Sequence, residues 1–210
     1  EETEEVNEFM VMAGITALFI MLILLLTQFN SFYQSFLILS AVFMSFVGVL
    51  LGLLISNRPF SSTMTGISIV TLAGIVVNNA IVLIDYIDLV KIRKRRELGM
   101  EEDTPLDNDL AMKCIEEGGQ KRLKPVLLTA ITTVLGLLPM ATGMNINFYT
   151  LLTELDAQIF FGGDNATFWG PMAWTVIFGL TFATFLTLII VPVMYLLADK
   201  VKNKMVKIIS

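Results

Sequence analysis

Residues 74–86, with the sequence GIVVNNAIVLIDY, place two asparagines and an aspartate inside an apolar run. Apolar residues continue on both sides of this motif, over residues 66–90. As a helix, this run is long enough to cross the hydrocarbon core of a bilayer, which is roughly 30 Å thick. Polar side chains in such a helix usually face other helices or a water-filled path. We therefore expect the polar groups of this helix to be the most informative in the chain.

Thr71, Asn78 and Asp85 are seven residues apart, so on a helix they form one line that drifts by only about 20° at each step. Ser68 extends this line, whereas Asn79 points about 100° away. Two interpretations stay open from the spacing. The line can make hydrogen bonds between helices, worth about 0.6 kcal/mol each on average. It can equally line a path for protons or ions.

The composition predicts an all-α integral membrane protein. The 210 residues are 55% hydrophobic, and the apolar residues come in long runs. A bilayer favours helices because the backbone polar groups must be satisfied within each segment. We expect five transmembrane helices, over residues 9–27, 36–56, 63–90, 125–144 and 171–198. The acidic residues 1–8 lead directly into the first helix and are expected to be the last residues of a preceding part of a larger polypeptide.

Basic residues predict the orientation. The five spans separate segments that alternate between the two sides of the membrane. All of the 14 basic residues except Arg58 lie in residues 91–124 or in the tail, residues 199–210. The positive-inside rule places both segments, and therefore the C-terminus, in the cytoplasm. The loop over residues 145–170, which is rich in aromatic residues that fit an interfacial belt, is then expected on the outer side of the membrane.

The basic cytoplasmic loop, residues 91–124, is expected to contain a short amphipathic helix over residues 105–117. Pro105 and Asp107 fit the first turn of a helix, and Gly118 with Gly119 can end it. An apolar stripe would place this helix along the membrane surface; the stripe comprises Leu106, Leu110, Ala111, Cys114 and Ile115.

Residue types exclude several functions. The chain has no histidine, and Cys114 is its one cysteine. Disulfides within the chain, histidine-dependent metal sites and Ser-His-Asp triads are therefore excluded, and no cofactor is expected. We also expect no nucleic-acid binding, because the basic cluster lies on a membrane loop where it can contact anionic lipid.

Small and hydroxyl-bearing residues mark faces for helix packing. Gly48 and Gly52 form a GxxxG pair, and a second small-residue face comprises Gly179, Ala183 and Thr187. A hydroxyl face on the fourth span comprises Thr129, Thr132, Thr133 and Gly136. Together with the polar residues of the third span, this face is typical of a hydrated seam, although ordinary packing explains it equally well.

Three segments together resemble a known family: the motif over residues 74–86, residues 121–143 (KRLKPVLLTAITTVLGLLPMATG), and residues 169–197 (WGPMAWTVIFGLTFATFLTLIIVPVMYLL). They resemble the C-terminal membrane half of resistance-nodulation-division (RND) efflux pumps, in the hydrophobe/amphiphile exporter branch known as the AcrB/AcrD/AcrF family. The resemblance implies that the five spans are helices eight to twelve of a twelve-helix protein. It also implies a location in the bacterial inner membrane, with residues 1–8 as the end of a periplasmic domain and residues 145–170 as a periplasmic loop.

The same resemblance implies a proton relay. In the family, two aspartates on the fourth helix exchange protons with a lysine on the tenth helix and a threonine on the eleventh. The lysine position is Asn78 here, and the threonine position is Thr129. Asp85 matches a family acidic position nearer the cytoplasmic end. Together with Thr71, these residues form the expected relay, although the amide of Asn78 cannot supply the positive charge of lysine.

The function implied by the resemblance is drug/proton antiport, so the chain would be part of a secondary active transporter and not an enzyme. Family members resemble one another in forming homotrimers with a periplasmic adaptor and an outer-membrane channel. A metal-ion exporter of the same superfamily is one alternative. A membrane scaffold or lipid-binding module that transports nothing is another, but it would not explain the line of Thr71, Asn78 and Asp85.

Overall fold

The computed structural model describes residues 2–101, 104, 106–156 and 158–209. Within this part of the chain, five helices contain apolar stretches long enough to cross a membrane, which confirms the predicted all-α membrane architecture. They are α1 (Glu2–Phe29), α2 (Phe32–Ile55), α3 (Ser62–Glu97), α4 (Asn108–Thr142) and α6 (Asp164–Ile209). A small hairpin, β1 (Met144–Ile146) and β2 (Ile159–Phe161), encloses the short helix α5 (Phe148–Glu154) between α4 and α6.

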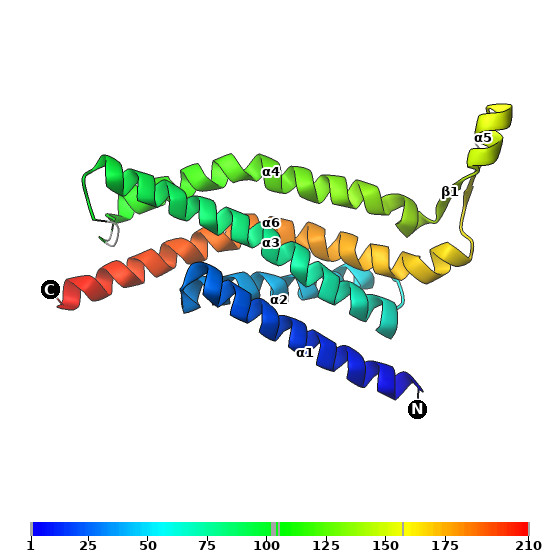
Figure 1. The fold of residues 1–210 in the computed structure, drawn as a ribbon, viewed down its shortest axis with the longest axis horizontal. Helices are drawn as coiled ribbons and strands as arrows, with labels where there is room; N and C mark the ends of the chain where they lie inside the picture. Colours follow the sequence, from blue (N-terminus) through cyan, green and yellow to red (C-terminus); the bar gives the residue numbers. More distant parts are fainter. Residues whose placement is uncertain (1, 102–103, 105, 157, 210) are drawn as a thin grey trace.

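The long helices lie alongside one another and alternate in direction (Figure 1). The α1–α2 and α3–α4 connections and the C-terminus lie at one end of the bundle, which we call the basic end because it carries the two basic segments. The N-terminus, the α2–α3 turn and the β1–α5–β2 hairpin lie at the other end, which we call the hairpin end (Figure 1). Arg58 lies in the turn between α2 and α3 and therefore belongs to the hairpin end, apart from the other basic residues.

Side chains at the helix starts explain the tight turns between the first three helices. The Ser31 and Ser61 hydroxyls accept backbone N–H groups of Gln34 and Met64 at the starts of α2 and α3, each at 3.4 Å. Such caps satisfy donors that the first turn of a helix leaves free. At the far end of α4, Gly143 adopts φ 69°, a left-handed conformation that glycine tolerates and that commonly ends helices.

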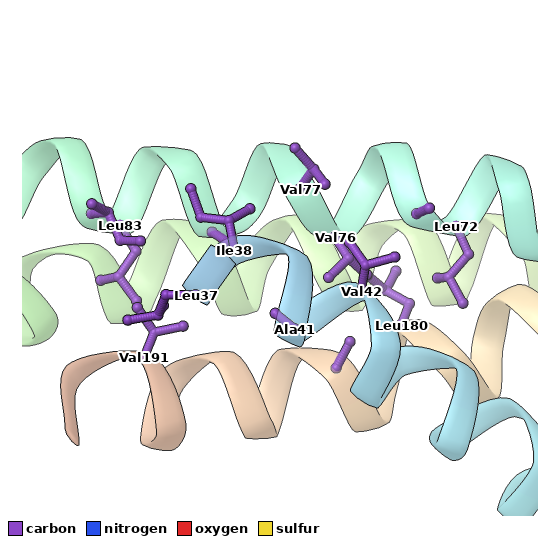
Figure 2. Packing of buried hydrophobic residues seen from close by; sticks show 14 of the residues in the cluster. Leu37, Ile38, Ala41, Val42, Leu72, Val76, Val77, Leu83, Leu180 and Val191 are labelled. Atoms are coloured by element: carbon purple, nitrogen blue, oxygen red, sulfur yellow. The ribbon is translucent and has the colours of Figure 1, made fainter. Parts of the chain in front are cut away.

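The apolar core lies between α2, α3 and α6. Figure 2 shows side chains from these three helices converging, among them Ile38 of α2, Leu72 and Leu83 of α3, and Leu180 of α6. Each of these four side chains is at most 1% exposed. α4 packs against α6 and α3, and α1 packs more loosely against α2 and α3.

Glycines let the core helices approach closely. A side chain at Gly48 would overlap with Phe182 of α6, and one at Gly52 would overlap with Phe178. On α6, a side chain at Gly179 would overlap with Leu72 of α3. These overlaps confirm the predicted small-residue faces on α2 and α6 as packing surfaces. Small residues suit this role in a membrane, where helices associate through close van der Waals contact and not through the hydrophobic effect.

The first helix leaves an apolar groove beside α2 and α3. Most side chains of α1 are exposed, and the groove has a volume of about 520 Å³. Its lining is almost entirely apolar, with Ser45 as the exception, and includes Phe19, Phe43, Phe46 and Val70. No catalytic chemistry follows from such a lining.

The prediction that Gly118 and Gly119 end a separate amphipathic helix is wrong. α4 begins at Asn108 and continues through both glycines and through Pro125 to Thr142. Gly118 serves packing instead, because a Cβ there would lie 2.8 Å from Ile87 Cγ1 and 3.3 Å from Ile87 Cα on α3. Pro105, the expected helix start, lies outside the described residues.

Three other segments are also more regular than expected. α3 continues past residue 90 to Glu97, so the basic cluster is helical. α1 begins at Glu2, so the acidic residues extend the first span as a helix. The predicted loop over residues 145–170 contains most of the β1–β2 pairing, with Asn145 opposite Phe160.

Substitution of Gly179 by alanine should destabilise the chain by about 1–3 kcal/mol, because overpacking forces neighbouring side chains to move. Gly14→Ala is the matched control, since an added Cβ there meets no described atom within 4 Å other than those of its chain neighbours and the adjacent backbone of its own helix. Thermal unfolding of both variants in detergent would measure the difference. Equal midpoints for the two variants would contradict the packing role of Gly179.

Candidate functional site

Thr71, Asn78 and Asp85, which we call the polar line, lie on one exposed face of α3. The opposite face carries Leu72 and Leu83 into the core. Ser68 does not extend the line as expected, because it is fully buried and donates to Met64 O at 2.5 Å. The polar line is thus a surface feature of this chain, directed away from the α2–α3–α6 core.

The polar line has few partners within the described part of the chain. Thr71 Oγ1 donates to Ile67 O one turn back along the helix, at 3.0 Å. Among the described residues, no hydrogen bond joins the Asn78 or Asp85 side chain to another group. Both polar ends are therefore available to another helix, to water or to lipid.

The hydroxyl face of α4 is also largely exposed. Thr129 Oγ1 donates to Val126 O at 2.9 Å, Thr132 to Leu128 O at 2.8 Å, and Thr133 to Thr129 O at 2.8 Å. These local bonds use the hydroxyl protons but leave acceptor capacity on each oxygen. The hydroxyls can therefore still accept hydrogen bonds from a group outside this chain.

α3 and α4 contact each other near the basic end. There, the Arg122 guanidinium lies 4.4 Å from the centre of the Tyr86 ring, and Gly118 packs on Ile87. The structure thus places Asn78 and Thr129 on exposed faces of two neighbouring helices, without a hydrogen bond between them.

A second group of polar residues joins α2, α3 and α6 at the basic end. We call it the Asp88 network, and it comprises Gln34, Asp88, Lys91, Tyr195 and Asp199. The Tyr195 hydroxyl donates to one oxygen of the Asp88 carboxylate. The Gln34 amide Nε2 donates to the other oxygen at 2.9 Å and lies 3.2 Å from the Tyr195 hydroxyl. Asp88 therefore receives bonds from two other helices.

Lys91 completes the Asp88 network. It is only 4% exposed, and its ammonium pairs with Asp199 of α6. The same ammonium lies 3.9 Å from the centre of the Tyr195 ring, close enough for a cation–π interaction. Tyr195 thus binds Asp88 through its hydroxyl and Lys91 through its ring face.

Sequence analysis missed this network, although part of the signal was present. Asp88 and Lys91 continue the buried stripe of α3 that contains Ile84 and Ile87, at helical spacing. A carboxylate and an ammonium on the apolar face of a helix need partners, because buried charges are costly unless they are paired. Counting Lys91 with the exposed basic cluster hid this pattern.

Two other residues with reactive or polar groups are held by contacts inside the fold. Cys114 is 3% exposed and packs with Val90 and Ala111, so its thiol belongs to a small apolar cluster. Trp174 of α6 is partly buried at the hairpin end. Its indole donates to Ala141 O at 2.7 Å, and the Arg58 guanidinium lies 4.2 Å from its ring centre.

A comparison with protein families gives a match to the AcrB/AcrD/AcrF family model over residues 1–199. The chain belongs to the AcrB/AcrD/AcrF family of RND transporters. This confirms the resemblance drawn from the three sequence segments.

The proteins similar to this chain include relatives named for different functions. Multidrug resistance protein MdtC of Erwinia tasmaniensis is 29% identical over 204 residues, which are 97% of this chain and 16% of that protein. Swarming motility protein SwrC of Bacillus subtilis is 33% identical over 193 residues, which are 92% of this chain and 15% of SwrC. A crystal structure of a heavy metal efflux pump matches with a TM-score of 0.61 and 26% identity, covering 87% of this chain and 14% of the pump. The AcrB/AcrD/AcrF chain described here therefore spans a small part of the length of its relatives.

The pairing of Lys91 with Asp199 gives a stability prediction. Lys91→Gln should lower the free energy of unfolding by about 3 kcal/mol, because it leaves a largely buried carboxylate without its cation. In the double variant Lys91→Gln/Asp199→Asn, the free energy of unfolding should fall by less than the sum of the decreases in the two single variants. Denaturant titration of the four proteins would measure this coupling.

Lys94→Gln is the control for this comparison of single and double variants. Lys94 pairs with Glu97 at 2.8 Å on an exposed surface, so its loss should leave the unfolding midpoint unchanged. Strict additivity of the Lys91 and Asp199 variants would contradict the pairing.

Proposed function

We propose that this chain forms the C-terminal membrane part of a proton-driven RND exporter of hydrophobic or amphiphilic compounds. Family membership supports an RND transporter, and the polar line is the observation that carries the proposal of coupling. An aspartate, an asparagine and a threonine lie in register on the exposed face of a helix whose opposite face is an apolar core. A packing helix that faced lipid would not need these groups.

The energetic argument concerns where the polar line can lie in a membrane. A charged side chain near the centre of a bilayer costs roughly 2.5–3.5 kcal/mol on insertion scales. This cost falls when the group faces water or another polar helix. The chain covers 14–16% of the three relatives described above, and we propose that a helix from the rest of a longer polypeptide covers this face.

Each proposed relay residue has a role set by its chemistry. Asp85 can take up and release a proton near the basic end of α3. Asn78 can donate and accept hydrogen bonds in the position of the family lysine, but it carries no charge. Thr71 and Thr129 offer hydroxyl oxygens that can accept a bond and orient water along the path.

We further propose that the basic end faces the cytoplasm and the hairpin end faces the periplasm, in the inner membrane of a bacterium. The concentration of basic residues at one end of the bundle supports this orientation. By family membership, the intact protein would assemble as a homotrimer with a periplasmic adaptor and an outer-membrane channel.

Export of metal ions is the second candidate function, favoured by the likeness to a heavy metal efflux pump. Cells that produce the intact protein would distinguish the two cargo classes by resistance to cationic dyes or to divalent metals. A membrane scaffold would confer neither resistance.

The polar line can be tested with neighbouring asparagines. Asn78→Leu in the intact protein should reduce dye export by about tenfold or more, a loss that corresponds to about 1.4 kcal/mol. Asn79→Leu is the matched control, because Asn79 has the same side chain but lies about 100° around the helix. Equal export by the two variants, at equal amounts in the membrane, would remove the support for a relay along this line.

The orientation can be tested with introduced cysteines. Native Cys114 is too buried to report on sidedness, so it should first be replaced by alanine. In intact cells, an impermeant thiol reagent should label Asn165→Cys at the hairpin end and should miss Lys113→Cys at the basic end; both positions are exposed. Labelling of Lys113→Cys from outside would reverse the proposed orientation.

A further inference from the structure

We propose that the Asp88 network is a proton-binding site, in which Asp88 holds one proton at neutral pH. The role of this site in transport rests on the proposed function, but the binding of the proton does not. The site differs from the polar line, since it lies on the buried side of α3 and takes its partners from α2 and α6.

The charges of the network do not balance. Two carboxylates, Asp88 and Asp199, share the single ammonium of Lys91, so the fully ionised network carries one net negative charge. The ammonium is hydrogen-bonded to Asp199. Asp88 is hydrogen-bonded only by the neutral Tyr195 hydroxyl and Gln34 amide among the described residues. Asp88 is therefore the carboxylate without a directly bonded cation.

The surrounding charged and titratable groups leave this imbalance in place. On α3, Arg95 is partly exposed, and its Nε donates to Thr104 O at 2.9 Å. On α4, Glu117 pairs with Lys121 at 2.9 Å on an exposed surface, and Cys114 is a buried thiol. On α2, the Tyr33 hydroxyl donates to Met194 O at 2.5 Å. Within the described part of the chain, none of these groups gives Asp88 a cation.

A proton would restore neutrality. Two carboxylates that share one site resist ionising together, and a low-polarity environment strengthens that effect. A hydronium ion or water at the basic end would supply the proton to an Asp88 oxygen, where a new O–H bond forms. The proton leaves by the reverse step, and Tyr195 keeps its own proton in both states. Water can reach the network, because the Asp199 side chain is 24% exposed and Asp88 is only partly buried.

The position of Asp88 connects this site to the proposed relay. Asp88 lies three residues after Asp85, so one stretch of α3 presents a carboxylate to the exterior and another to the core. Gain or loss of a proton at Asp88 would change the charge at the point where side chains join α2, α3 and α6. The network thus offers a proton-linked charge change that Asn78 cannot provide.

Infrared spectroscopy of the purified intact protein in lipid nanodiscs tests the site. Exposed carboxyl groups have ordinary pKa values of about 4, so they are ionised at about pH 7. A C=O band of a protonated carboxyl group at that pH therefore reports a retained proton. We expect such a band in the unmodified protein, its loss or reduction in Asp88→Asn, and no change in Asp109→Asn, where the aspartate is exposed.

Tyr195→Phe is a second variant that tests the same assignment if Asp88→Asn fails to fold. It removes one hydrogen bond to Asp88, so the C=O band should persist and shift to higher frequency. A protein without a protonated-carboxyl band at neutral pH would overturn the proposal. So would a band that neither Asp88→Asn nor Tyr195→Phe alters. The band decides the proton site even if the intact protein exports nothing, which separates its failure from that of the proposed function.

Discussion

Polar groups in a hydrocarbon environment need hydrogen-bond or ion-pair partners, and this constraint explains where the polar residues of α3 lie. Its buried face is largely apolar, with Thr65 and Ser68 as buried hydroxyls near the hairpin end. At the basic end this face reaches Asp88 and Lys91, which bind groups on α2 and α6. Its exposed face carries Thr71, Asn78 and Asp85, which find no side-chain partner among the described residues. One helix therefore satisfies its polar groups inside the chain on one side and leaves them for an external partner on the other.

The close approach of the helices makes this division possible. Gly48, Gly52 and Gly179 bring α2, α3 and α6 together closely enough that added side chains would overlap with their neighbours. This packing fixes the rotation of α3 about its axis. With that rotation fixed, the line of polar residues can face only outward, and Asp88 can reach both Gln34 and Tyr195. The apolar packing and the polar geometry are two consequences of the same helix positions.

Sequence analysis predicted the features that depend on one helix at a time. The five spans, the shared face of Thr71, Asn78 and Asp85, and the small-residue faces follow from length, spacing and side-chain size. Features that depend on contacts between helices were missed. Gly118 was expected to end a helix because its contact with Ile87 of α3 cannot be read from local sequence. The Asp88 network joins residues 54 and 107 positions apart, so no local spacing shows it. The sequence contained one indication of the network, which is that Asp88 and Lys91 continue the apolar stripe of α3.

The central claim is that the polar line of α3 faces a polar partner in the intact protein. A cryo-electron microscopy structure of the intact polypeptide in a lipid nanodisc would test this claim most directly. The account predicts that a polar side chain of another membrane helix, or ordered water, lies within hydrogen-bonding distance of the Asn78 amide. Lipid acyl chains packed along Thr71, Asn78 and Asp85 would contradict it.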